Sequence, residues 1–365
     1  MKVDGVPYRT IWLADDGWRV SIIDQNQLPH AFVSIDLETV EDAARAIKAM
    51  TVRGAPLIGA TGAYGLALAL RQDPSDASLR AAHDLLINTR PTAQNLSWAL
   101  NSVHQSVGTL SEKDRASAAY RRAAEICDSD VEMCRSIGEH GALLLSNLWE
   151  EKERPLTLNV LTHCNAGWLA TVDWGTALSP IYWASDNGVP IHVWVDETRP
   201  RNQGASLTAW ELCKYGISHT VIVDNAGGHL MQRGRVDVVL TGTDRTTACG
   251  DVCNKVGTYL KALAAHDNEV PFYVALPSPT IDWSITDGTH KIPIEERDSY
   301  EVSHISGQTD DGRIETVRLI SEESPALNIA FDVTPAKYVS GLITERGVCE
   351  ASSKGLLGLY PERAT

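Results

Sequence analysis

Residues 158–167 read Leu-Asn-Val-Leu-Thr-His-Cys-Asn-Ala-Gly, an apolar run that ends on a thiol, an amide and a glycine. A short apolar run bounded by small and polar residues is typical of a strand buried on both faces of a sheet. In open parallel sheets, ligands bind at the carboxyl ends of the strands. We therefore expect Cys164 at the rim of such a sheet, where it can meet a ligand.

Similar apolar runs recur along the second half of the chain, and helical patterns separate most of them. We predict strands at residues 157–162, 191–195, 220–223, 236–240 and 272–276, with helices at 168–178, 204–215 and 255–266. Apolar strands that alternate with helices predict an α/β fold, in which a doubly wound parallel sheet is covered on both faces.

The first half of the chain has a different pattern. Two strand-like runs, 8–13 and 18–23, flank a turn sequence and predict a short antiparallel hairpin. Thr39 is predicted to cap a helix, and further helices are predicted at 54–71, 93–107 and 114–147, the last broken near 127–130. A charged segment near residue 150 indicates a boundary between a smaller, mixed and mostly helical domain (1–150) and the sheet domain (151–365).

Composition and charge narrow the class of protein. The 365 residues carry a net charge of −15, which argues against nucleic acid as a partner because phosphate backbones need clustered cations. The first residues lack the apolar core of a signal peptide, and the most apolar stretch, 55–70, is short for a membrane span. Seven cysteines in no disulfide-framework spacing agree with this, so we expect a cytoplasmic protein with reduced thiols and no membrane partner.

Two residues at predicted strand ends are candidates for catalysis. We expect Cys164 where a strand turns into a helix, whose N-terminus would lower the pKa of the thiol; the alternative is a buried structural cysteine. Asp244 follows the run 236–240, and a carboxylate in that place can act as a general acid or base. The alternative is a loop aspartate that caps the next helix, a role that suits Asp251 better.

Several residues near predicted helix starts are candidates for binding an anion. Arg53 precedes a helix with proline in its first turn, and the free N–H groups of a helix start favour an anion. Arg90 also leads into a helix, and Gln203 at another helix start could hold sugar hydroxyls or phosphate. Asn254 and Lys255 are predicted to begin a helix that meets an anionic group. For the two arginines the alternative is a solvated surface charge, and for Gln203 it is a plain helix cap.

Two further motifs are assigned no chemistry. Cys249 and Cys253 suggest a metal site with His163 or His290, but one C-x₃-C pair without a second matched pair is a weak signal, so no metal is expected. The charged segment 292–298 is interpreted as an ion-paired loop.

Seven segments of the chain together resemble the methylthioribose-1-phosphate isomerase family. They are 52–56 (Val-Arg-Gly-Ala-Pro), 90–96 (Arg-Pro-Thr-Ala-Gln-Asn-Leu), 161–167 (Leu-Thr-His-Cys-Asn-Ala-Gly), 197–200 with 203–205 (Glu-Thr-Arg-Pro and Gln-Gly-Ala), 242–245 (Gly-Thr-Asp-Arg), 250–258 (Gly-Asp-Val-Cys-Asn-Lys-Val-Gly-Thr) and 292–298 (Ile-Pro-Ile-Glu-Glu-Arg-Asp). They run in order over most of the chain, which makes the resemblance specific.

The resemblance implies a Rossmann-like C-terminal domain, a smaller N-terminal domain and a homodimer. It implies that Cys164 and Asp244 form the catalytic pair. The residues that it implies for substrate binding are Arg53, Gly54, Ala55, Arg90, Gln203, Asn254 and Lys255. The implied reaction is an aldose–ketose isomerisation in methionine salvage, from 5-methylthioribose 1-phosphate to 5-methylthioribulose 1-phosphate, with a small phosphorylated sugar as the partner and no metal or other cofactor.

The chemistry of this reaction fits the candidate pair. A phosphate on the anomeric carbon blocks the free aldehyde, so the furanose must open with the help of an acid at the ring oxygen, for which Asp244 is the candidate. Hydrogen must then move from C2 to C1. Cys164 either carries it as a proton through an enediol(ate) or assists a direct hydride shift, and both routes stay open at this point.

Two departures from the family pattern bear on substrate preference. Trp168 stands where a small residue such as alanine is expected in the family, and Gly227 stands where alanine is expected. The alternative substrates are 5-deoxyribose 1-phosphate and ribose 1,5-bisphosphate. A non-catalytic regulatory subunit, like those of the eukaryotic initiation factor exchange complex, is a different alternative that predicts loss of the Cys and Asp pair, and both residues are present. A dinucleotide-dependent dehydrogenase is weaker still, because no G-x-G-x-x-G follows the run 158–162.

Overall fold

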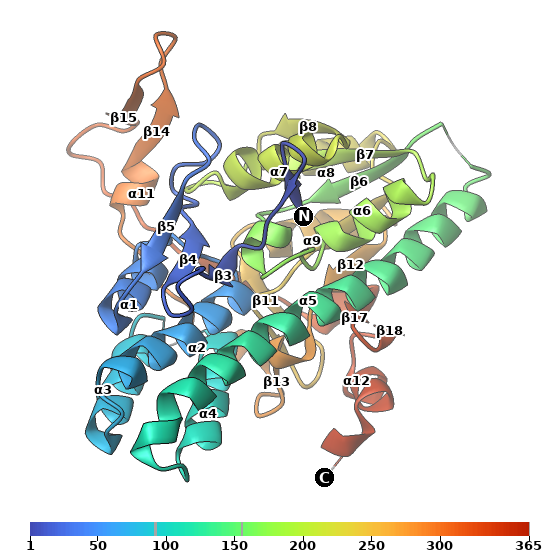
Figure 1. Ribbon diagram of the computed structural model, residues 1–365. Helices are drawn as coiled ribbons and strands as arrows, with labels where there is room; N and C mark the ends of the chain where they lie inside the picture. The colour runs from blue at the N-terminus through green and yellow to red at the C-terminus, as the bar shows by residue number, and fades with distance from the viewer. Residues whose placement is uncertain (91–92, 155, 365) are drawn as a thin grey trace.

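The computed structural model describes residues 1–90, 93–154 and 156–364, in which a helical part lies beside a large sheet (Figure 1). The helical part is drawn in blue to green and the sheet part in green to red. The fold is mixed α/β, as the alternation of strand and helix patterns predicts.

The helical part begins with short strands and continues with five helices. The strands are β1 (Lys2–Val3), β2 (Val6–Pro7), β3 (Ile11–Leu13), β4 (Val20–Ile23) and β5 (Ser34–Leu37). The helices are α1 (Val40–Lys48), α2 (Ala55–Gln72), α3 (Asp76–Ile87), α4 (Gln94–Val107) and α5 (Glu112–Glu151). The predicted hairpin is confirmed, because β3 and β4 pair antiparallel, and β5 extends them to a three-stranded sheet.

Local sequence explains where these helices begin and how they pack. Thr39 caps α1 as predicted, since its hydroxyl accepts the N–H of Asp42 while the Asp42 carboxylate accepts the N–H of Thr39. Almost every side chain of α2 is apolar, and a helix that is apolar on all sides is expected to be buried. Accordingly, α2 lies in the middle of the helical part, in contact with α1, α3, α4 and α5.

The second half of the chain builds a seven-stranded sheet. Its strands are β6 (Leu158–Thr162), β7 (Ile191–Asp196), β8 (Ser218–Ile222), β9 (Val238–Thr241), β12 (Phe272–Ala275), β17 (Gly341–Thr344) and β18 (Gly347–Cys349). The strand order is β18-β17-β12-β9-β6-β7-β8, and every neighbouring pair is parallel except β17 with β18. The five predicted strands are confirmed to within two residues at each end.

Helices cover both faces of this sheet because successive strand residues point to opposite sides. In β9, Val238 and Leu240 pack with α5, α6 (Leu178–Asp186) and α7 (Ala209–Tyr215), whereas Val239 packs with the opposite layer. That layer consists of α8 (Ala226–Gln232), α9 (Thr258–Asp267) and α12 (Ser353–Leu359). The result is a sheet between two helical layers, with apolar strands that read as near-continuous hydrophobic runs.

Smaller elements surround the carboxyl ends of the large sheet. A four-stranded sheet has the order β13-β10-β11-β16, formed by β10 (Arg245–Thr247), β11 (Val252–Lys255), β13 (Ile281–Asp282) and β16 (Phe331–Thr334). The short helices α10 (Gly288–Lys291) and α11 (Tyr300–Ser303) lead to the hairpin of β14 (His304–Gln308) and β15 (Ile314–Arg318), which projects from the molecule in Figure 1.

Two predicted features of helices are wrong. The predicted break at 127–130 is absent, and α5 runs continuously because its polar residues find partners without leaving the helix: Asp130 accepts the N–H of Val172 at 2.7 Å, and Asp128 pairs with Arg9. The predicted helix at 168–178 is also wrong. Only a 3₁₀ turn forms at Trp168–Ala170, because N–H groups there donate to the side chain of Glu211.

Two further boundaries differ from the prediction. The helix predicted at 255–266 begins at Thr258, and Asn254 and Lys255 belong to β11, where they pair with β16. Pairing across the sheet therefore overrides the helical pattern at these residues. Helix α3 was not predicted, although Ser75 caps it through the N–H of Ser78.

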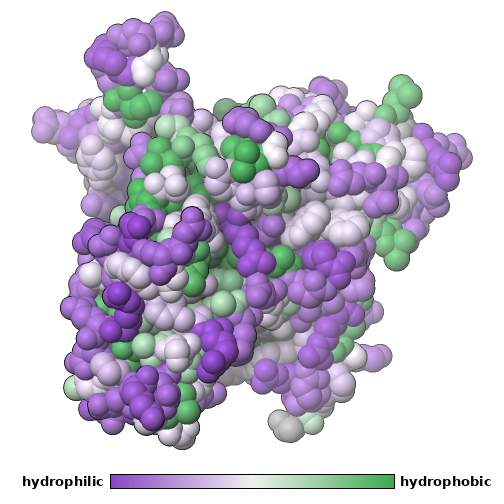
Figure 2. Space-filling model, in the orientation of Figure 1, coloured by the Kyte–Doolittle hydropathy of each residue, from purple (hydrophilic) through white to green (hydrophobic). Residues whose placement is uncertain are grey.

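The surface is mainly hydrophilic on the face that Figure 2 shows, with hydrophobic residues in small separate patches. Within residues 1–90, 93–154 and 156–364, none of the helices combines the length and the apolar character that a membrane crossing requires.

Candidate active site

Cys164 lies two residues after the end of β6 and has a left-handed backbone conformation, with φ of 65°. This conformation is uncommon for a residue that carries a side chain. Two threonine hydroxyls hold it in place: Thr198 Oγ1 accepts the N–H of Cys164 at 2.8 Å, and Thr208 Oγ1 donates to its carbonyl oxygen at 2.7 Å. The thiol is thus fixed at the carboxyl end of a central strand, where the sequence predicts it.

Replacing Thr208 by valine is expected to lower the free energy of unfolding by about 1–3 kcal/mol. Valine keeps the shape of threonine but leaves the buried carbonyl of Cys164 without this donor, and it removes one of the two acceptors of the Asn165 side-chain amide. Urea unfolding followed by circular dichroism measures the change, with Thr208→Ser as the control that retains the hydroxyl. Equal stability of the valine and serine variants would contradict this account.

The thiol of Cys164 is buried, and it lies 3.3 Å from Oε1 of Gln203, to which it donates. Burial raises the pKa of the thiol; the charges of Arg53 and Lys255 lower it, and the charge of Asp244 raises it. The prediction that a helix N-terminus lowers this pKa is wrong, because the chain after Cys164 forms a loop and a 3₁₀ turn.

Asp244 lies in the turn between β9 and β10, so the predicted position after a buried strand is confirmed. The residue keeps some exposed surface, yet protein atoms enclose its carboxyl group. This burial raises the pKa of Asp244 above its usual range; Lys255, Arg90 and Arg53 lower it, and Glu295 raises it. The structure therefore brings Asp244 within electrostatic reach of Cys164 and of three of the predicted binding cations.

Asp251 does not cap the next helix along the chain, α9, contrary to the interpretation that suited it best. It precedes β11, and its carboxylate accepts the N–H groups of Gly288 and Ala336, both at 2.9 Å. Asp251 thus joins loops around the small sheet.

Arg53, Gly54 and Ala55 form the entry into α2. The buried guanidinium of Arg53 donates from Nη2 to the carbonyl of Asn165 at 2.6 Å and from Nη1 to its side-chain oxygen. Gly54 has φ of 89°, and a Cβ at this position would lie 2.4 Å from the carbonyl oxygen of Ala170, so only glycine fits. Ala55 is the first residue of α2 and lines a small cavity together with Arg90 and Asp244.

Arg90 and Lys255 both lie near the ring of Phe331. The ammonium of Lys255 lies 4.6 Å from the centre of the Phe331 ring, and the guanidinium carbon of Arg90 lies 6.0 Å from it. Burial lowers the pKa of Lys255, whereas Cys164 and Asp244 raise it. The two residues that follow Arg90 in the predicted motif, Pro91 and Thr92, lie outside the described residues.

Asn254 is buried on β11 and donates from its side-chain amide to Thr258 Oγ1 at 3.0 Å. This contact braces the start of α9 against the strand that carries Lys255. Asn254 and Lys255 were predicted to bind an anion at the start of a helix. That helix begins three residues later than expected, at Thr258.

Glu211, a buried carboxylate to which the sequence analysis assigned no role, supports the loop after Cys164. It accepts the side-chain amide of Asn165 at 2.8 Å, the N–H groups of Trp168 and Leu169, and the hydroxyl of Tyr182 at 2.9 Å. Burial raises the pKa of Glu211 to about 7. A glutamate within the apolar stretch of a helix is the signal that could have indicated such a role.

Gly167 is the point where this loop passes Glu211. A Cβ at Gly167 would lie 1.9 Å from Oε2 of Glu211. The glycine that ends the opening stretch of sequence is thus required by a carboxylate 44 positions further along the chain.

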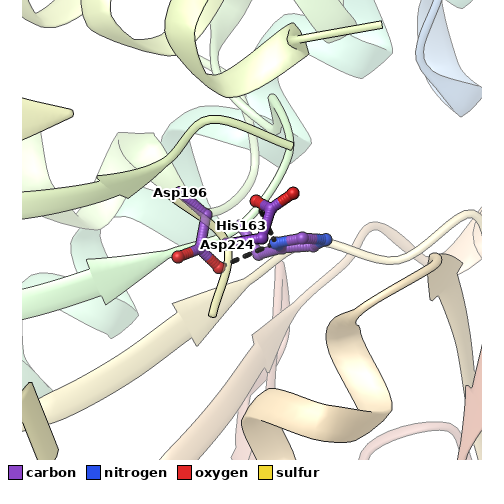
Figure 3. A group of neighbouring side chains, drawn as sticks. All are labelled: His163, Asp196 and Asp224. Atoms are coloured by element: carbon purple, nitrogen blue, oxygen red, sulfur yellow. Dashed lines mark hydrogen bonds and ion pairs between the residues drawn. The ribbon is translucent and has the colours of Figure 1, made fainter. Parts of the chain in front are cut away.

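A second buried cluster lies beneath the site, at His163, Asp196 and Asp224 (Figure 3). The Nδ1 atom of His163 lies 2.8 Å from Asp196 Oδ2, and its Nε2 atom lies 2.8 Å from the carbonyl oxygen of Val256. The ammonium of Lys261 lies 3.1 Å from the same Asp196 oxygen. Since a cation already neutralises Asp196, we interpret the cluster as an ion-paired support that joins Cys164, next to His163, with Lys255, next to Val256.

The other candidates from the sequence lie elsewhere. Cys249 contacts the carbonyl of Thr286, and within the part of the chain that the structure describes, it forms no ligand group with Cys253, His163 or His290. Trp168 packs in an apolar core cluster rather than against the catalytic candidates, and Gly227 lies where a Cβ would meet Lys261.

A cavity of about 360 Å³ opens beside Gln203, the hydrogen-bond partner of the Cys164 thiol, and extends toward the β14–β15 hairpin. Arg53 and Gln203 line its inner end, Met50 and Leu207 supply apolar surface, and Arg201 and Glu301 lie at its outer side. The cavity therefore combines cations, the amide of Gln203 and apolar side chains. This combination suits a small ligand with a charged end and an apolar end.

Comparison with known proteins connects this geometry to characterised sequences. Residues 51–351 match the Initiation factor 2 subunit family. The chain is 63% identical over 364 residues to a methylthioribose-1-phosphate isomerase of Paramagnetospirillum magneticum, which covers 100% of both chains. It is 60% identical over 368 residues to a protein of the same name from Rhodospirillum rubrum, with coverage of 100% of this chain and 94% of the relative.

Two solved structures are also similar over nearly the whole chain. One is 5-methylthioribose 1-phosphate isomerase from Pyrococcus horikoshii, at 38% identity and a TM-score of 0.82, covering 98% of this chain and 96% of that one. The other is described as the delta subunit of translation initiation factor eIF-2B from A. fulgidus, at 38% identity and a TM-score of 0.78, covering 97% and 100%.

Proposed function

This chain belongs to the initiation factor 2 subunit family, and we propose that it is an isomerase which converts 5-methylthioribose 1-phosphate to 5-methylthioribulose 1-phosphate in methionine salvage. The observation that carries the proposal is that the thiol of Cys164 and the carboxyl of Asp244 lie within electrostatic reach of each other and of three cations at the rim of the sheet. Full-length relatives that bear the name of this enzyme support it.

The cations provide the place for the phosphate group. Arg53, Arg90 and Lys255 act electrostatically on the catalytic pair and would bind an anion that sits between them. Gly54 and Ala55 place the start of α2 in the same region. Gln203 lies there as well, because its side chain accepts a hydrogen bond from the thiol of Cys164. We propose that these residues, with Asn254 bracing Lys255, bind the substrate.

Asp244 is the proposed acid for ring opening. A carboxyl group whose pKa is raised by burial keeps its proton at a higher pH than usual and can transfer it to the ring oxygen as the C1–O bond breaks. The proton is then on the new C4 hydroxyl, and the electron pair of the broken bond stays on that oxygen. C1 is left electron-poor and ready to receive hydrogen.

Two routes can complete the isomerisation. In the proton route, Cys164 removes the C2 hydrogen as a proton, and the electron pair of that bond forms a C1–C2 double bond. Cys164 then returns a proton to C1 while the C2 hydroxyl loses its proton to a base, and C2 becomes the ketone. In the hydride route, hydrogen moves from C2 to C1 with its electron pair, the C2 hydroxyl loses its proton to a base, and C2 becomes the ketone. Cys164 stands at the reacting carbons in both routes.

We also propose the finer architecture that the family resemblance implies. The parallel strands follow the spatial order 3-2-1-4-5-6 when counted along the chain, which supports a Rossmann-like sheet domain with a boundary near residue 150. Exposed apolar side chains on and after β15 (Ile314, Val317, Leu319 and Leu327) support a homodimer, which a mass measurement in solution would test. Seven free cysteines support a reducing compartment such as the cytoplasm.

A coupled assay with three substrates tests the proposed function. Methylthioribose 1-phosphate, 5-deoxyribose 1-phosphate and ribose 1,5-bisphosphate are offered separately, and formation of the ketose is followed. We expect the highest kcat/KM for methylthioribose 1-phosphate, because Met50 and Leu207 provide an apolar wall for a methylthio group. Turnover of none of the three would overturn the assignment. A preference for ribose 1,5-bisphosphate would make that sugar the assigned substrate instead of methylthioribose 1-phosphate.

A further inference from the structure

The charged segment that includes Glu295, Arg297 and Glu301 reaches the active site through Arg90. Glu295 Oε2 lies 3.0 Å from Nε of Arg90, and both side chains are largely buried, at 19% and 8% exposure. Burial makes this contact stronger than a surface ion pair, because water screens it less. The pair joins residues 205 positions apart in the chain.

Glu295 is itself held firmly. Its other carboxylate oxygen accepts Nη1 of Arg297 at 2.8 Å, and Arg297 donates from Nη2 to Glu301 at 2.8 Å. Glu301 also binds Arg201 at 2.9 Å, at the outer side of the cavity. The result is a chain of alternating charges that leads from Arg90 to the rim of the cavity.

The backbone fixes the same segment. The N–H of Ala330 donates to the carbonyl of Glu295 at 3.0 Å, and the N–H of Arg297 donates to the carbonyl of Asn328 at 2.9 Å. Phe331, next along the chain from Ala330, has its ring beside both Arg90 and Lys255. The carboxylate of Glu295 therefore has a defined position relative to the two cations.

We propose that Glu295 is a positioning residue that accepts a hydrogen bond from Nε of Arg90. This contact keeps the guanidinium facing the substrate phosphate, so that it does not pair with Asp244. Arg90 and Asp244 line the same small cavity, so Asp244 is the available partner once Glu295 is lost. A pair between them would withdraw the cation from the phosphate and keep the acid ionised. This inference rests on the proposed function of Arg90 and Asp244.

Other charged or titratable groups also face Asp244, and the proposal has to hold in their presence. They are Lys255 and Cys253 on β11, Arg53 before α2, Cys164 after β6, and Arg245, which lines the same small cavity. Lys255 and Arg53 lower the pKa of Asp244, whereas Glu295 raises it. Loss of the Glu295 charge therefore lowers this pKa directly, and a new Arg90–Asp244 pair would lower it further.

The test compares Glu295→Gln with Glu296→Gln, which removes the same charge from an exposed neighbour. Asp244 must be protonated to act as an acid, so activity falls as the pH rises through its pKa. We expect Glu295→Gln to shift this fall toward lower pH by about one unit. We also expect it to raise the KM for methylthioribose 1-phosphate and the inhibition constant of inorganic phosphate about tenfold. Glu296→Gln should match the wild type in all three.

A second variant separates orientation from charge. Glu295→Asp keeps the charge but shortens the reach to Nε, so we expect weaker phosphate binding and a smaller shift of the pH profile than in Glu295→Gln. The proposal is overturned if Glu295→Gln matches Glu296→Gln in the pH profile and in phosphate inhibition. This holds even if Glu295→Gln has a lower melting temperature, because a loss of stability alone does not show a positioning role. If Glu295→Gln does not fold, unchanged phosphate inhibition in Glu295→Asp overturns it.

Failure of the proposed function gives a different result. In that case the wild type itself turns over none of the sugar phosphates. Binding of inorganic phosphate, measured by calorimetry on wild type and both Glu295 variants, still reports whether Glu295 positions Arg90 for an anion. Equal phosphate affinity in all three proteins would overturn the positioning role by itself.

Discussion

Asp244→Asn is expected to lower kcat by a factor of about 10² to 10⁴, the usual contribution of a general acid. Asparagine keeps the shape of the side chain but has no proton to transfer to the ring oxygen. KM should change little, since Arg53, Arg90 and Lys255 are the groups that we propose for binding the phosphate. Steady-state kinetics with methylthioribose 1-phosphate measure both constants.

The control for this variant is Asp237→Asn, at the amino end of the same strand. Asp237 pairs with Lys152 at 2.9 Å and lies at the opposite end of β9 from Asp244. Loss of its charge should therefore leave kcat unchanged. The pH profile adds a second check. Because burial raises the pKa of Asp244, wild-type activity should persist to a higher pH than an ordinary aspartic acid allows and then fall. More than a tenth of wild-type kcat in Asp244→Asn would remove its role as the acid.

The sequence predicts the main sheet and the two catalytic candidates because both depend on local patterns. The run at 158–162 is apolar and ends on Cys164, and the run at 236–240 leads to Asp244, so strand ends and candidates follow together. The same holds for α1, where Thr39 and Asp42 cap the helix within four residues. In these places, one short segment contains all the information that its structure needs.

The supports of the site could not be predicted because they join distant segments. Glu211 meets Asn165 across 46 positions and Glu295 meets Arg90 across 205, and no local pattern relates these pairs. The same reason explains the error at Lys255, whose helical pattern yields to pairing of β11 with β16. The expected low pKa of the Cys164 thiol also failed, since burial depends on the whole fold.

Cys164→Ala is expected to lower kcat by a factor of about 10² or more, because we propose that the thiol acts at the carbons between which hydrogen moves. The control is Cys127→Ala, which also removes a buried thiol but lies in the core of the helical part, and its kcat should equal that of the wild type. A full rate in Cys164→Ala would exclude the thiol from the reaction.

The isotope content of the product decides how the thiol acts. Burial raises the pKa of Cys164, so the thiol is protonated in the free enzyme and is poorly suited to remove a proton from C2. We therefore expect the hydride route, in which substrate labelled with deuterium at C2 keeps its label at C1 of the product. Mass spectrometry of the ketose formed in ordinary water, and in deuterium oxide with unlabelled substrate, measures this transfer. Solvent deuterium at C1 would instead show that a base removes the proton from C2. If that base is Cys164, substrate binding must lower the pKa of its thiol, and Arg53 and Lys255 are the cations able to do so.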